Sequence, residues 1–75
     1  MKDKNWGNFM YEWDMFHRSE LIEIIRNGTV EEKKPINVLL TDMKSNMIWC
    51  RLNYCIAIYK SLKEIVENHN KRNKS

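Results

Sequence analysis

A chain of 75 residues holds one domain at most and is too short for a nucleotide-binding α/β domain or an enzyme with a separate substrate domain. Its composition, 43% hydrophobic and 31% charged with two glycines and one proline, excludes collagen-like and disordered chains. The formal net charge of +3 comes from residues 71–75, which hold three of the 13 Lys and Arg and no acid, so residues 1–70 are formally neutral.

The first 26 residues have the clearest period in the chain. Apolar and aromatic side chains recur there at three- and four-residue steps, the spacing of one helical face. The sequence predicts one helix over about residues 4–26, with Glu20 as the one charged interruption of that face. Asn27-Gly28 is expected to end this helix in the left-handed conformation. The members of the face are Trp6, Phe9, Met10, Trp13, Phe16, His17, Leu21, Ile24 and Ile25.

Two signals compete in the connection that follows this helix. Thr29 and Glu32 have the spacing of a capping box, which marks the start of a helix. Pro35 would then be the sixth residue of that helix, where its ring clashes with a carbonyl of the preceding turn. Since Pro35 fits better in the first turn of the next helix, residues 27–34 are predicted to form a loop, with one helical turn within it as an alternative.

From Ile36 to His69 the apolar residues again have helical spacing. One helix over residues 36–69 would be about 51 Å long, more than the first helix can cover. Residues 41–46 include types that favour caps over helix interiors, so we predict a short helix over 36–43 and a long one over 46–69.

A single straight helix over 36–69 is one alternative to this division. A strand within residues 47–59 is another, which the absence of a nearby hairpin turn disfavours. The predicted fold class is all-α, a helical hairpin or small three-helix bundle over residues 1–70 that a partner chain completes, followed by a disordered basic tail over 71–75.

The long helix is apolar on two opposite sides. The first helix covers only one of them, and a helix that is apolar nearly all round must be covered on both sides. We predict that the second side, together with Tyr11, which lies off the apolar face of the first helix, is a protein interface. A second copy in a homodimer or a larger protein would cover it. Its residues on the long helix are Ile48, Trp49, Leu52, Ile56 and Tyr59.

No pattern in the sequence indicates catalysis, a metal or a cofactor. Asp14, His17 and Glu20 follow one another at three-residue steps, but a metal site in a bundle also needs ligands from facing helices. The other histidine, His69, is far along the chain, and no glycine-rich turn builds a phosphate or oxyanion cradle. We therefore expect a protein that is not an enzyme and carries no cofactor.

Cysteine content and termini indicate the compartment. Two cysteines are fewer than a small secreted domain uses, and the first residues lack the pattern of an export signal. The apolar run over residues 47–59 is shorter than a bilayer-spanning helix. We expect a cytoplasmic protein with no membrane partner. Nine Asn, nine Lys and eight Ile are typical of AT-rich coding sequences, such as those of low-GC bacteria, their phages and mobile elements.

A small helical protein without chemistry of its own is expected to act by binding, so we predict a protein-interaction module that regulates a larger protein. The alternative is a dimeric DNA-associated transcriptional regulator that uses the basic tail, through Lys71, Arg72 and Lys74. It is less favoured because the cations gather in the tail rather than on a folded face. A scaffolding component of an assembly is a third candidate.

Overall fold

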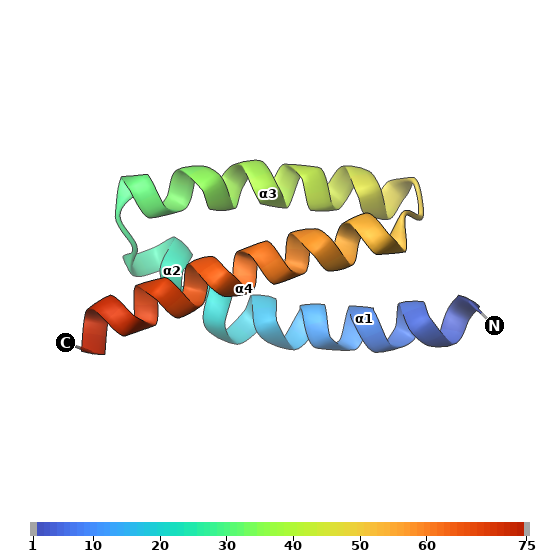
Figure 1. Ribbon diagram of the computed structural model, residues 1–75, viewed down its shortest axis with the longest axis horizontal. Helices are drawn as coiled ribbons and strands as arrows, with labels where there is room; N and C mark the ends of the chain where they lie inside the picture. The colour runs from blue at the N-terminus through green and yellow to red at the C-terminus, as the bar shows by residue number, and fades with distance from the viewer. Residues whose placement is uncertain (1, 75) are drawn as a thin grey trace.

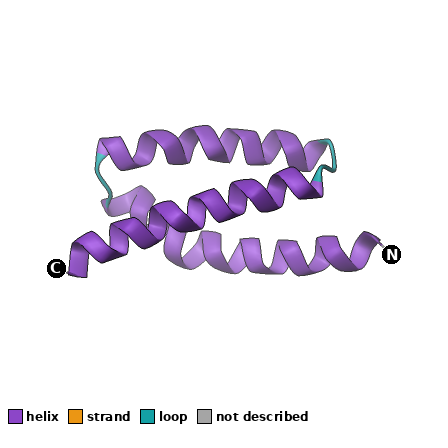
Figure 2. Cartoon of the chain, in the orientation of Figure 1, coloured by secondary structure: helices purple, strands orange, loops and turns teal. Residues whose placement is uncertain are grey.

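The computed structural model describes the backbone of residues 2–74 and the side chains of residues 5–72. Within this range the chain forms helices and no strands (Figure 2), which confirms the predicted all-α class and small helical bundle. The elements are α1 (Lys2–Phe16), a π-helical segment (His17–Leu21), α2 (Ile22–Asn27), α3 (Val30–Ile48) and α4 (Leu52–Lys74). None of these helices has both the length and the hydrophobicity needed to cross a bilayer.

Helix α4 is the centre of the bundle. It forms an antiparallel hairpin with α3 on one side and lies against α1 on the other (Figure 1). Two groups of buried side chains hold the helices together. The main core cluster lies toward the α2 end and consists of Phe16, Leu21, Ile24, Ile36, Leu62 and Val66. The small core cluster lies toward the α3–α4 turn and consists of Phe9, Met43 and Cys55.

The first helix is not one regular α-helix, because its fifth turn is a π segment. The backbone N–H of Ile22 donates to the carbonyl of His17, five residues earlier. The extra residue in the π turn shifts the register of the helix. Phe16 and Leu21 are therefore both buried, although they lie five positions apart rather than the three or four of a regular apolar face. Glu20, which a regular helix would place on the apolar face, is exposed instead. The π segment thus removes the charged interruption and redirects the chain toward α3.

Helix α3 begins at Val30, so the predicted loop over residues 27–34 is wrong beyond Thr29. Both halves of the Thr29–Glu32 capping box are formed, and they outweigh the proline. Pro35 lies inside the helix, where it removes the bond to the carbonyl of Glu31. Both residues are exposed, and an unpaired carbonyl costs less free energy at the surface than in the core.

The break between the last two helices lies at residues 49–51 rather than at 42–46. The polar side chains that were expected to cap helices bond instead to carbonyls one turn earlier in α3. The hydroxyl of Thr41 donates to the carbonyl of Asn37 at 3.0 Å, and the amide of Asn46 donates to the carbonyl of Asp42 at 2.8 Å. The helix therefore continues through these residues to Ile48.

The end of α4 and the end of α2 also differ from expectation. Helix α4 reaches Lys74, so residues 71–74 are helical where a disordered tail was predicted. Gly28 ends α2 in an extended conformation rather than the left-handed one. Glycine is required there by a close approach, because a Cβ would lie 2.6 Å from the carbonyl oxygen of Ile24.

Candidate protein-interaction surface

The α3–α4 turn holds two of the predicted interface residues out in solvent. The N–H of Arg51 donates to the carbonyl of Asn46 at 2.9 Å, and that of Cys50 donates to the carbonyl of Met47 at 3.1 Å. This pair of bonds is a Schellman motif, and Cys50 occupies its left-handed position with φ of 55°. The side chains of Ile48 and Trp49 are 72% and 68% exposed. A hydrogen-bonded turn therefore presents two large apolar groups.

Three other predicted interface residues line a groove between α1 and α4. Leu52, Ile56 and Tyr59 form its α4 side, and the groove has a volume of about 510 Å³. These three side chains are half-buried, because α1 packs beside them. Helix α1 therefore covers part of the predicted interface, and Ile48 and Trp49, which precede α4, remain exposed.

Tyr59 and Tyr11 mark the continuation of this groove along α1. The Tyr59 ring packs edge-on against Phe16 and Phe9, with ring centroids 5.3 and 5.9 Å apart. On its other side Tyr59 borders a second depression, lined also by Tyr11 and Met15. Tyr11 is exposed, as its position off the apolar stripe of α1 predicted. Four of the six predicted interface residues thus border one surface, and Ile48 and Trp49, in the turn that leads into α4, do not line it.

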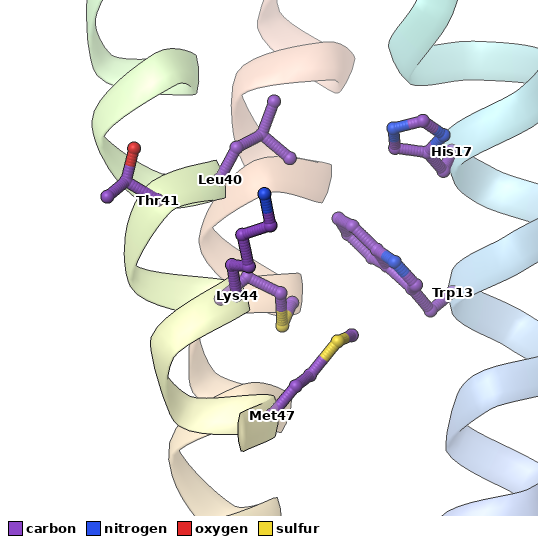
Figure 3. Close-up of a pocket in the computed structure, with 7 residues that line it drawn as sticks. Trp13, His17, Leu40, Thr41, Lys44 and Met47 are labelled. Atoms are coloured by element: carbon purple, nitrogen blue, oxygen red, sulfur yellow. The ribbon is translucent and has the colours of Figure 1, made fainter. Parts of the chain in front are cut away.

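A second groove, between α1 and α3, was not predicted. Figure 3 shows Trp13 and His17 on one side of it, facing Leu40, Lys44 and Met47 on α3. Its volume is about 360 Å³, and Met47 also lines an adjoining hollow of about 300 Å³. The spacing of apolar residues predicts an apolar face on each of these two helices, but no feature of the sequence indicates that α1 and α3 leave a groove between them. The hollow is completed by Trp6, Met10 and Cys50.

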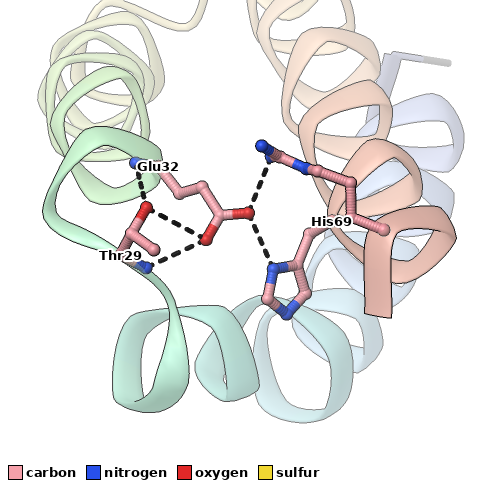
Figure 4. Close-up of polar contacts among 4 residues, drawn as sticks. Thr29, Glu32 and His69 are labelled. Carbon is pink, nitrogen blue, oxygen red and sulfur yellow. Dashed lines mark hydrogen bonds and ion pairs between the residues drawn. The ribbon is translucent and has the colours of Figure 1, made fainter. Parts of the chain in front are cut away.

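At the opposite end of the bundle, a polar cluster around the buried carboxylate of Glu32 links α3 to α4 (Figure 4). One of its oxygens accepts the backbone N–H of Thr29 at 2.9 Å. The other lies 2.8 Å from Nδ1 of His69 and accepts a bond from Arg72, also at 2.8 Å. His69 is buried too, so the start of α3 and the end of α4 are bound to each other. Sequence analysis found the Thr29–Glu32 pair but not its partners on α4, which are about 40 residues away.

These contacts lower the pKa of Glu32 to about 2. The hydrogen bond from the backbone of Thr29 is the main cause, followed by the hydrogen bond to His69. Burial opposes the shift, and the charges of His69 and Arg72 add to it. Glu32 is therefore a carboxylate at neutral pH and acts as the acceptor at the centre of the cluster.

The residues considered for a metal site and for nucleic-acid binding, where their side chains are described, lie on the surface or in ion pairs. Asp14 accepts a bond from Arg18 at 3.0 Å, and no group of three or more potential ligands able to hold a metal occurs among the described residues. In the predicted nucleic-acid set, Arg72 is ion-paired with Glu32 and Lys71 is exposed. The side chain of Lys74 lies outside the described residues.

Comparisons with known proteins found no matching family model, no similar curated protein and no similar solved structure.

Proposed function

We propose that this chain is a non-enzymatic protein-interaction module, a small regulator that binds a larger protein through Ile48 and Trp49 and the neighbouring α1–α4 groove. The observation that carries the proposal is the exposure of Ile48 and Trp49, at 72% and 68%, in a turn that the backbone holds in one conformation. Tryptophan is among the residues that contribute most to binding energy at interfaces.

The hydrogen bonding of the turn supports this role. A partner that binds an unstructured loop must offset the entropy lost when the loop is ordered, and two backbone hydrogen bonds in this turn reduce that cost. The groove residues Leu52 and Ile56 follow directly in α4 and supply further apolar surface. A cytoplasmic site of action and an origin in a phage or mobile element are part of the proposal, supported by the cysteine content and the Asn-, Lys- and Ile-rich composition.

Site-specific photocrosslinking in the native host tests the proposal. A photoreactive phenylalanine analogue replaces Trp49 in one strain and Val38 in another, because Val38 is similarly exposed but lies within α3, away from the turn. We expect a discrete crosslinked band from position 49 and none from position 38. Mass spectrometry of the band then identifies the partner as a larger protein or as a second copy of the chain.

Two outcomes would contradict this function. One is the absence of a crosslink at position 49 in cells that contain the folded protein. The other is the same set of crosslinks from positions 49 and 38, which would indicate random collision. Sedimentation of the purified chain at micromolar concentration measures the homodimer separately, and a Trp49→Ala variant that sediments as wild type would exclude the turn from self-association.

A further inference from the structure

The α1–α3 groove lies apart from Ile48 and Trp49, and the side chains that line it have helical spacing on both sides. On α1 and the first residue of the π segment its wall consists of four side chains at steps of four, three and four residues: Trp6, Met10, Trp13 and His17. This wall is about 16 Å long, or about three helical turns. Leu40, Lys44 and Met47 form the facing wall on α3, at steps of four and three residues (Figure 3). The α3 wall is shorter, about 10 Å, and two helical walls with side chains at this spacing are typical of a groove that binds a third helix.

The α1–α3 groove is lined mainly by flexible apolar side chains and aromatic rings. Three of the five methionines of the chain, Met10, Met43 and Met47, gather here beside Trp6 and Trp13. Methionine side chains adapt to different apolar shapes and are common on surfaces that bind amphipathic helices. Met10 remains 41% exposed, so the groove is open to a ligand.

The charge beside the groove is positive. Lys44 lines it and makes no ion pair with any described residue. No acidic side chain lines the groove among the described residues, and Asp14, next to Trp13 in the chain, is paired with Arg18 at 3.0 Å. His17 adds an imidazole ring, whose N–H can donate a hydrogen bond. An occupant with carboxylates along the edge of its apolar face would complement this border.

We propose that the α1–α3 groove binds an amphipathic helix of a partner protein, with apolar side chains at positions i, i+4 and i+7 and acidic residues beside them. The proposal rests on the chain being a protein-interaction module, but it uses a different surface from Ile48 and Trp49. The acidic residues pair with Lys44, and the apolar residues pack on Trp13 and Met47.

A displayed library of randomised helical peptides of about 16 residues, selected against the whole chain, tests this proposal. We expect enriched peptides with the stated apolar spacing and a net negative charge. Synthetic enriched peptides are then measured by fluorescence anisotropy against the wild type and the variants Met10→Glu and Met15→Glu. Both methionines are exposed on α1, at 41% and 53%, but Met15 lines the depression beside the α1–α4 groove.

Met10→Glu is expected to weaken binding at least about tenfold, and Met15→Glu to leave it unchanged, with circular dichroism confirming that both variants fold. Lys44→Glu should weaken acidic peptides about threefold and strengthen their Glu→Lys versions, whereas Lys34→Glu on exposed α3 surface should do neither. The proposal is overturned if no helical peptide is enriched, if the enriched peptides are basic, or if they bind Met10→Glu as they bind the wild type. It is also overturned if Met10→Glu abolishes self-association of the chain, since a second copy is then the occupant. Any of these contradicting results would leave the crosslinking result at Trp49 unaffected, because the two experiments test different surfaces.

Discussion

At the polar end of the bundle, where α3 begins, a buried carboxylate is bonded to groups at the start of α3 and on α4 (Figure 4). At the turn end, where α3 turns into α4, two large apolar side chains are exposed to solvent. The main core cluster of six buried residues lies toward the first end, and the small cluster of three toward the second. The polar end therefore has more of the interactions that stabilise the fold.

This difference teaches how a short chain can both fold and bind. Apolar residues that pack in the core of the chain are not available to contact a partner, and apolar residues that remain on the surface do not stabilise the monomer. Stability concentrated at one end leaves the turn end and the two grooves beside α1 available for contacts. The predictions below test that division, starting with the core.

The core beneath the polar end is expected to contribute most to stability. Leu62→Ala removes a fully buried side chain from the main core cluster and should lower the free energy of unfolding by about 3–5 kcal/mol. Met43→Ala in the small cluster should cost about 2 kcal/mol, because its cavity opens into the α1–α3 groove and neighbouring side chains can relax into it. Urea denaturation followed by circular dichroism measures both. Equal losses would show that the two ends are equally supported.

The link between the ends of α3 and α4 is expected to come next. His69→Ala removes a buried partner of the Glu32 carboxylate and should cost about 2 kcal/mol, since hydrogen bonds to charged groups contribute more than neutral ones. His17→Ala is the matched control, because that ring is half-buried and lines a groove. The control should lose less than about 1 kcal/mol in the same urea titration. A larger loss for His17→Ala would place the critical contact in the groove instead.

The polar cluster also predicts how stability depends on pH. The pKa of Glu32 is about 2 in the folded chain against an ordinary value of 4.5, so the unfolded chain binds more protons between these values. The stabilisation is complete above about pH 4.5 and is lost as the pH falls toward 2. Glu32→Gln should be less stable than the wild type at pH 7, and this difference should shrink by pH 3. Urea titrations at both pH values measure it, and Glu31→Gln should retain the wild-type dependence.

The sequence predicted those elements that depend on a regular period. The apolar stripe from Trp6 to Ile25 specified the first helix, and the spacing after Leu52 specified the last one, because burial of one face fixes a helix. The π segment was not predicted, although Glu20 on the apolar face, with Phe16 and Leu21 five residues apart, was its signal. The capping box at Thr29 and Glu32 and the helix-breaking effect of Pro35 were both recognised in the sequence. Which of them prevails depends on whether the carbonyl of Glu31 is at the surface, and the sequence does not show this.

The candidate site was predicted less completely than the fold. Ile48 and Trp49 were predicted to be exposed because the long helix has more apolar surface than one chain can cover, and Tyr11 because it lies off the apolar face of the first helix; all three are exposed. The α1–α3 groove and the pairing of Glu32 with His69 depend on how the helices are arranged in space, and local spacing carries no information about either. The position of the α3–α4 turn also lacked a signal, since neither Gly, Pro nor Asn occurs at residues 49–51.

That missing signal yields the last prediction, at the turn end. Cys50 adopts a φ of 55° at the position of a Schellman motif where glycine is usual, and a side chain in this region costs about 1 kcal/mol. Cys50→Gly should relieve this cost and, after the greater entropy of glycine in the unfolded chain, raise the free energy of unfolding by about 0.5 kcal/mol. Cys50→Ala keeps the Cβ and should give no gain, which separates backbone strain from loss of the thiol. Since the glycine variant retains the turn, it should also retain the crosslink at Trp49. A destabilised Cys50→Gly variant would mean that the Cys50 side chain itself, beside Trp6 and Met10, stabilises the turn end, and the contrast between the two ends would then be smaller than the exposed residues suggest.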